Sequence, residues 1–311
     1  MSDSFWFQST DSHVIGRVRI ALALVTGCYF VSAMTDVSTW FAVGAPASSS
    51  NLAGFFREAG LESDARWMIS PLFLWDSIFA GTGLSESTAV YQIYLVIGVL
   101  IAFGVAALST ERVLIWRIPR LLRGSLPVVL LWIWFVGWAN RIVLLAGLVE
   151  PVLSLSLAAL AIAPVCREGV SWRNHFATRL IAVQGSLVLI ATTALMLAGN
   201  VWWNGTGAYA MIAPVEDRWL DIRESLFETT WVYELVSAIT LLSLPVGLMM
   251  AWTSKWKRIG IGLILVWCFL VALLSMKILY ALTIAIIAFT LGTGNISRRY
   301  FQSHESRSHQ E

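Results

Sequence analysis

The feature that most constrains this chain is a series of apolar runs, most of them long enough to cross a lipid bilayer. A bilayer core about 30 Å thick requires about 20 apolar residues in helical form. Runs of that length lie at 14–37, 88–109, 176–199 and 230–252. Two more runs, 125–164 and 259–291, exceed one crossing, and we divide them at Arg141 to Glu150 and at Ser275 to Lys277. The pattern predicts an all-α, polytopic membrane bundle of about eight transmembrane helices.

Composition excludes several other classes of protein. Of the 311 residues, 58% are hydrophobic and 13% are charged, whereas about a quarter of the residues in an average soluble domain are charged. No basic tract indicates a nucleic-acid partner. Cys28, Cys166 and Cys268 are far apart, and the four histidines lie outside the apolar runs. We therefore interpret the cysteines as apolar filler and expect no metal site and no cofactor.

Lysine and arginine predict the orientation of the chain. They are concentrated after the second, fourth, sixth and eighth predicted helices, at 112–123, 167–173, 255–258 and 298–307. Basic flanks favour the cytoplasmic side, so both termini are expected there, with the acid-rich loops 38–87 and 200–229 outside. The expected layout is a cytoplasmic segment 1–13, a transmembrane domain 14–293 and a cytoplasmic tail 294–311. The first fourteen residues lack the pattern of a removable signal peptide.

A few polar residues fall within or beside the apolar runs. Because such groups are costly in contact with hydrocarbon, each is a candidate for function. Arg141, Glu150, Glu234 and Lys277 all approach the outer leaflet in the predicted topology, and Gln184 lies within the fifth helix. These residues could line one polar cavity. An ion pair between Arg141 and Glu150 that braces the turn between two helices is the structural alternative.

One segment carries a more specific pattern, RLIAVQGSLVLIATTALMLAGNVWWNGTGAYAMIAP from Arg179. It resembles the horizontally transferred transmembrane (HTTM) domain, a family that includes vitamin K-dependent gamma-carboxylase and the B component of the sporulation-delaying-peptide maturation system. In this family the motif begins with arginine-leucine and a glutamine, followed by an apolar helix. A lysine comes next, then a tryptophan, any two residues, a glycine, a small residue and an aromatic residue. The residues that match this motif are Arg179, Leu180, Gln184, Trp202, Gly205, Thr206 and Tyr209. Weaker matches to the family lie elsewhere in the chain, at Arg19, Arg141, Glu234 and Pro245.

The segment also departs from the family pattern. In carboxylases of this family, the lysine before the tryptophan acts as, or beside, the base that starts hydroquinone oxidation. Met196 stands at that place here, between Leu195 and Leu197, and a thioether cannot take up a proton. The chain also ends soon after the eighth helix, without the extra lumenal domain of the animal enzyme. We therefore do not expect gamma-glutamyl carboxylase activity, and we assign no catalytic residue.

Two functions remain open. The resemblance implies a non-catalytic factor in a bacterial cytoplasmic (inner) membrane that assists the maturation or export of a secreted peptide. Its partners would be membrane lipid, a peptide precursor and a second membrane protein. The alternative is a membrane enzyme or carrier that binds a quinone-like amphipathic ligand in the outer-leaflet cavity. Neighbouring genes would favour the first function, and a copurifying ligand would favour the second.

Overall fold

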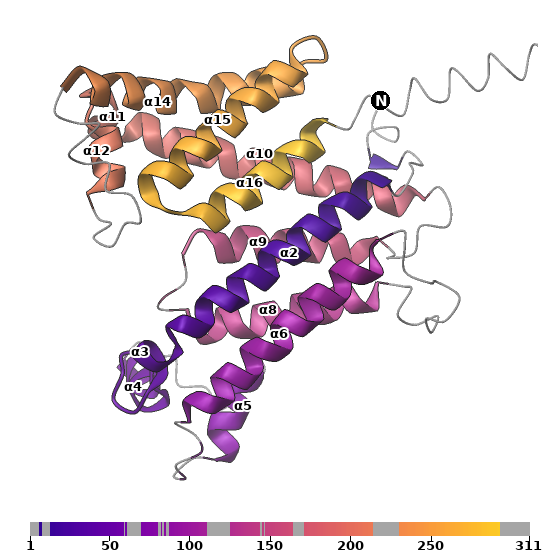
Figure 1. Cartoon of the computed structure of the whole chain (residues 1–311), viewed down its shortest axis with the longest axis vertical. Coiled ribbons are helices and arrows are strands. Elements are labelled where there is room, and N and C mark those ends of the chain that lie inside the picture. The colour runs from indigo at the N-terminus through magenta and orange to yellow at the C-terminus, as the bar shows by residue number, and fades with distance from the viewer. Residues whose placement is uncertain are drawn as a thin grey trace, which may run out of the picture. The chain divides into compact units, whose positions relative to one another are not determined.

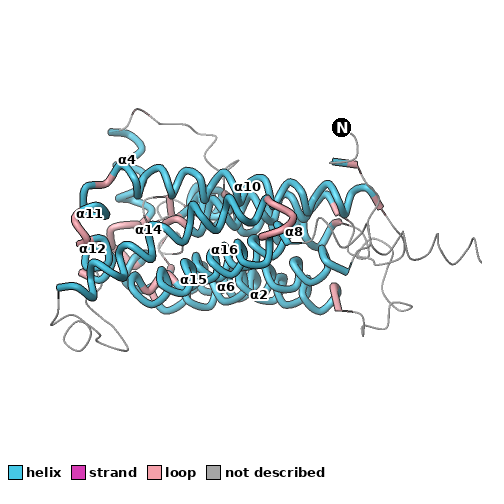
Figure 2. The backbone as a smooth tube through the Cα atoms, turned by 90° about the horizontal axis from the view of Figure 1, so that it is seen from above, coloured by secondary structure: helices cyan, strands magenta, loops and turns pink. Residues whose placement is uncertain are grey.

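The computed structural model describes residues 6–7, 13–58, 60, 70–79, 82, 84, 87–110, 125–143, 145, 147–163, 171–213 and 230–292. All the regular elements in these ranges are helices (Figures 1 and 2). The chain divides into two compact units. Unit 1 comprises Met1–Val14 and Gly169–Glu311, and unit 2 comprises Ile15–Glu168.

In the described part of unit 2 there are four longer helices and three short ones. The longer helices are α2 (His13–Thr35), α6 (Thr88–Leu108), α8 (Leu126–Arg141) and α9 (Val149–Ile162). The short ones are α3 (Val37–Phe41), α4 (Ser49–Glu58) and α5 (Pro71–Ile78). Tyr94 and Trp134 join α6 to α8, because each side chain donates to the backbone carbonyl of the other, at 2.9 and 3.0 Å. The short helices lie where α2 ends and α6 begins (Figure 1).

The described residues of unit 1 form four longer helices, α10 (Trp172–Ala198), α14 (Thr230–Trp252), α15 (Lys257–Ser275) and α16 (Ile278–Gly292). Two short helices, α11 (Asn200–Trp203) and α12 (Gly207–Ile212), follow α10. Helices α14 and α15 approach closely at Gly247 and Gly260, where a Cβ on Gly260 would lie 2.6 Å from the Gly247 carbonyl oxygen. Small residues at such contacts are typical of helix pairs in membranes.

Among the described residues, five helices are long and apolar enough to cross a membrane, which is consistent with an integral membrane protein: α2, α6, α10, α14 and α15. Apolar side chains on them are exposed, among them Leu100 at 66%, Met249 at 73% and Phe269 at 65%. Exposed apolar surfaces of this kind are more stable in contact with lipid than with water. Helices α8, α9 and α16 are apolar but contain only 16, 14 and 15 residues. Eight crossings therefore remain a prediction.

The predicted positions of the apolar helices are confirmed. Helix α8 ends at Arg141 and α9 begins at Val149, so the first long run is divided where the sequence indicated. The second long run breaks between Ser275 and Ile278, where Met276 has φ 55°. A residue with positive φ cannot continue a right-handed helix, so the chain turns at this point.

Candidate functional site

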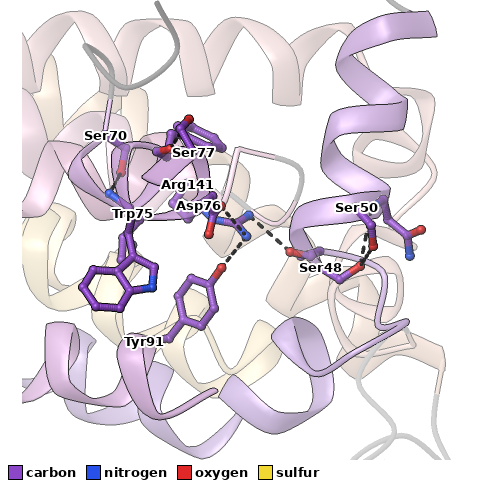
Figure 3. A network of polar contacts seen from close by, with 12 residues as sticks. Ser48, Ser50, Ser70, Trp75, Asp76, Ser77, Tyr91 and Arg141 are labelled. Atoms are coloured by element: carbon purple, nitrogen blue, oxygen red, sulfur yellow. Dashed lines mark hydrogen bonds and ion pairs between the residues drawn. The ribbon is translucent and has the colours of Figure 1, made fainter. Parts of the chain in front are cut away.

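Arg141 organises a polar cluster at the end of unit 2 that α3 and α5 cover. It is the last residue of α8, and its side chain is 0% exposed. Its Nη2 donates to the Tyr91 hydroxyl at 2.6 Å and lies 3.6 Å from Asp76 Oδ2 (Figure 3). Its Nη1 donates to the Ala47 carbonyl at 3.2 Å. The buried guanidinium therefore has both a counter-charge and neutral acceptors, as burial of a charge requires.

Aromatic rings surround the same guanidinium. Its carbon lies 5.3 Å from the ring centroid of Phe41, 5.4 Å from that of Phe73 and 5.1 Å from that of Tyr91. A cation is attracted to the faces of such rings, more strongly where water is excluded. We call Phe41, Ala47, Phe73, Asp76, Tyr91 and Arg141 the Arg141 cluster.

Local sequence explains how α5 presents Asp76 to this cluster. Ser70 caps the helix, since its hydroxyl accepts from Leu72 N at 3.3 Å, and Pro71 occupies the first helical position. Both residues are favoured at those places. The helix then directs Phe73 and Asp76, three residues apart, toward Arg141. The cluster thus joins α3, α5, α6 and α8, together with the turn at Ala47.

Glu150 forms a second buried polar contact in unit 2. Its side chain is 8% exposed, and its Oε1 accepts from the Tyr29 hydroxyl at 2.7 Å. Its Oε2 accepts from Gly147 N, also at 2.7 Å. Because Glu150 lies in the first turn of α9, the positive end of the helix dipole also favours its negative charge. The contact joins α2 to α9.

In unit 1 the motif residues after α10 form a compact turn against α14. Gly205 has φ 73°, and a Cβ there would lie 2.6 Å from Glu234 Cγ, so glycine is required both by its conformation and by space. Ser237 Oγ donates to the Gly205 carbonyl at 2.9 Å and accepts from Ala208 N at 2.8 Å. Ala208 and Leu274 belong to one buried cluster, which brings the end of α15 to the same place.

The remaining motif residues lie at other points along α10. Met196 is 6% exposed in the last turn, whereas Leu195 and Leu197 are exposed. Gln184 is half-buried and lies 14 residues before Ala198, about 21 Å along the helix axis. Arg179 lies still nearer the start of the helix. The motif therefore contributes to two separate places in unit 1.

The five residues of the predicted cavity divide between the units. Arg141 and Glu150 lie in unit 2 with separate partners: the structure pairs Arg141 with Asp76 and bonds Glu150 to Tyr29 and Gly147. Gln184, Glu234 and Lys277 lie in unit 1, where Glu234 and Lys277 are exposed near the turn formed by 199–212. A single cavity lined by all five residues remains a prediction.

The sequence interpretation missed three partners, Asp76, Tyr91 and Tyr29. From the sequence, Asp76 belongs to the acid-rich loop 38–87. In the structure it is the single acidic residue of the apolar helix α5, which begins at Ser70 and Pro71. A capped apolar segment with one acid could have indicated a partner for a buried arginine. The two tyrosines gave no such signal, because aromatic residues are frequent in this chain.

The contacts of these sites bind charged groups and brace helices against one another. Within the ranges that the structure describes, no group of three or more histidine, cysteine or acidic residues could hold a metal ion. The Arg141 cluster holds a buried guanidinium among aromatic rings and polar partners.

Comparison with known proteins adds no family: no protein-family model, no curated protein and no solved structure matches the chain.

Proposed function

We propose that this chain is a non-catalytic factor of a bacterial cytoplasmic membrane that assists the maturation or export of a secreted peptide. It would cross the membrane eight times, with both termini in the cytoplasm, and would belong to the HTTM type. The observation that carries the proposal is the buried thioether of Met196 at the end of α10, at the place where the family's carboxylases carry a lysine. A thioether offers no proton transfer there, and the turn that follows retains the rest of the motif.

The surface beside that turn supports a peptide as the partner. Glu234 on α14 and Lys277 after α15 are both exposed there. Trp203, Tyr209 and Trp231 are 66%, 55% and 62% exposed. Tryptophan and tyrosine are enriched at protein interfaces, and the two charges offer partners for the ends or side chains of a peptide.

Deleting the gene for this chain tests the proposal. We expect one or more small secreted peptides to disappear from the medium, as measured by mass spectrometry of low-mass fractions. Complementation with the wild-type gene should restore them, whereas Glu234→Gln should not. Unchanged secreted peptides in the deletion strain would contradict the proposal.

The absence of carboxylation can be tested separately with purified protein. We expect no incorporation of labelled bicarbonate into a glutamate-containing peptide in the presence of vitamin K hydroquinone. Incorporation that depends on this protein would show that another residue replaces the missing lysine, and Lys277 would be examined first. Such a result would refute the non-catalytic part of the proposal and leave its topology unaffected.

The topology has its own test. Single cysteines at Ser49 and Ser254, in a chain whose three native cysteines are replaced by serine, should react with an impermeant thiol reagent from opposite faces of the membrane. The two sites lie beyond α2 and beyond α14, and the distribution of lysine and arginine assigns them to different sides. Labelling of both cysteines from the same face would refute the count of eight helices.

A second candidate, a carrier of a quinone-like amphipathic ligand, is favoured by the Arg141 cluster. Aromatic rings and a guanidinium could bind a ligand with a flat ring and an acceptor oxygen. Asp76 lies farther from Arg141, at 3.6 Å, than the Tyr91 hydroxyl and the Ala47 carbonyl do, and it is the partner that such an oxygen would displace. Organic extraction of purified wild-type protein and of Arg141→Gln should then yield a bound quinone from the wild type alone. Extracts without a ligand from both proteins would remove this candidate.

A further inference from the structure

Two aromatic residues near the N-terminus pack on the first turns of α10. Between ring centroids, Phe7 lies 5.7 Å from Trp172 and 5.9 Å from Phe176, and Trp6 lies 5.8 Å from Phe176. Trp172 and Phe176 are four residues apart on one helix face and lie 6.3 Å from each other. Edge-to-face and offset ring pairs at such spacings are stabilising. We call Trp6, Phe7, Trp172 and Phe176 the N-terminal aromatic cluster.

Local sequence fixes the α10 side of this cluster. Ser171 caps the helix, and its hydroxyl accepts from Arg173 N at 3.2 Å, so α10 begins at Trp172. Serine is favoured at this place because it satisfies a backbone donor of the first turn. Trp172 and Phe7 remain 45% and 53% exposed. The N-terminal pair is therefore docked on the surface of a helix end.

This contact holds residues 6–7 on unit 1, although most of the helix that follows them belongs to unit 2. The chain passes between the units twice, after Val14 and after Glu168. The second crossing joins the units covalently in any state. The first adds a connection only while the N-terminal segment stays docked on α10, because a released segment would be a tail of unit 2.

Both crossings leave each unit at one end. In unit 2, Arg19 Nη2 near the start of α2 donates at 3.1 Å to the carbonyl of Ala163, which caps the end of α9. In unit 1, the N-terminal segment is docked at the start of α10 itself. The Arg141 cluster, which includes α3 after the end of α2, and the turn formed by 199–212 lie at the opposite ends of their units.

We propose that the N-terminal segment is a strap that tethers the two units at the end where α2 and α10 begin. A single connection lets two bodies swivel about a point, whereas two separate connections allow rotation about one axis. Docking of Trp6 and Phe7 therefore restricts movement between the units to a hinge at this end. Hinge movements are a common way for parts of one chain to open around a ligand. The strap requires neither the peptide nor the quinone considered above.

The test uses the full chain with a protease site inserted between Glu168 and Gly169 and an affinity tag at the C-terminus. Cleavage in detergent removes the second crossing and leaves the strap on the N-terminal fragment. We expect this fragment of the wild type to stay bound to the tagged fragment. Trp6→Ala, Phe7→Ala should weaken the association at least about tenfold in a dilution series, because three ring contacts are lost and each contributes about two- to tenfold.

Reciprocal and matched variants control this test. Trp172→Ala, Phe176→Ala removes the other half of the cluster and should release the fragment to a similar extent. Trp256→Ala is the matched control, since Trp256 is also 45% exposed in unit 1 but lies outside the cluster, and it should leave the association unchanged. Equal retention in the wild type and in Trp6→Ala, Phe7→Ala would overturn the proposal. Loss of the fragment from the cleaved wild type would overturn it as well.

A second measurement uses the uncut chain. Spin labels at Thr110 and Thr253, both exposed and beyond the ends of α6 and α14, report the distance between the units by double electron–electron resonance. The native cysteines are replaced by serine. We expect a broader distance distribution in Trp6→Ala, Phe7→Ala than in the wild type, and identical distributions would refute the tether.

A milder variant keeps the test decisive if the double variant does not fold. Phe7→Leu removes two of the three ring contacts and retains an apolar side chain. It should release the cleaved fragment more readily than Trp256→Ala does. Equal release by these two variants would count against the strap.

Discussion

The two units of this chain treat buried polar groups differently. The described part of unit 2 buries three charged side chains, Arg19, Arg141 and Glu150, at 2%, 0% and 8% exposure. Each has hydrogen-bond partners, and Arg19 Nη2, for example, donates to the Ala163 carbonyl at 3.1 Å. In the described part of unit 1, the polar side chains that are buried belong to serine, threonine, asparagine and histidine. Its Glu234 and Lys277 are exposed.

The difference indicates separate roles for charge. In unit 2 the buried charges form internal contacts. Those of Arg141 hold α3 and α5 against the longer helices α6 and α8. In unit 1 many of the hydroxyls bond to their own helix, as Thr240 does to the Val236 carbonyl at 2.7 Å, and helices α14 and α15 meet through glycine. Two of its charged residues, Glu234 and Lys277, are exposed and can be reached by a ligand or partner.

The largest expected effect comes from breaking the buried pair in unit 2. Arg141→Gln removes the buried guanidinium from beside Asp76 and should lower the free energy of unfolding by about 3–5 kcal/mol. Thermal unfolding in detergent, followed by near-ultraviolet circular dichroism, measures the loss. The double variant Arg141→Gln, Asp76→Asn also removes the Asp76 charge and should recover part of the stability. Equal losses in the single and double variants would show that the ion pair itself does not matter.

The corresponding test in unit 1 concerns packing. A Cβ on Gly260 would lie against the backbone nitrogen of Ala251 and 2.6 Å from the Gly247 carbonyl oxygen. Because backbone atoms cannot swing aside, Gly260→Ala should cost about 1–3 kcal/mol. Gly262→Ala, two residues away with nothing within 4 Å, is the matched control and should be neutral or slightly stabilising. Similar values of Tm for the two variants would contradict the close approach of α14 and α15.

These contrasts also show what the sequence could predict. The apolar runs gave the helix positions, including both breaks, because helix length and hydropathy are local properties of the chain. The partners of Arg141 were not predicted, since Asp76 and Tyr91 are 65 and 50 residues away along the chain, and only packing decides which of several acids and tyrosines reaches the guanidinium. The close helix contact at Gly260 could not be predicted either, because nothing in the local sequence distinguishes Gly260 from Gly262.

A smaller effect is expected at the second buried contact of unit 2. Tyr29→Phe removes one of the two hydrogen bonds to Glu150 and should cost about 1–2 kcal/mol, in the upper range for bonds between membrane helices. Tyr209→Phe is the control, because Tyr209 is 55% exposed and its hydroxyl can bond to water. Chemical denaturation in mixed micelles compares the two variants. A loss for Tyr29→Phe no greater than that for Tyr209→Phe would show that the Glu150 contact adds nothing to stability.

The smallest effect on stability is expected at Glu234, where the two units can be compared with the same chemical change. Glu234 is exposed, so Glu234→Gln should change the free energy of unfolding by less than about 0.5 kcal/mol. Glu150→Gln weakens two short hydrogen bonds to a buried carboxylate and should cost more. If Glu234 contacts a secreted peptide, its variant should remain folded and monodisperse while peptide secretion is lost. Parallel loss of Tm and secretion would instead assign Glu234 a bracing role, as in unit 2, and would end the contrast between the units.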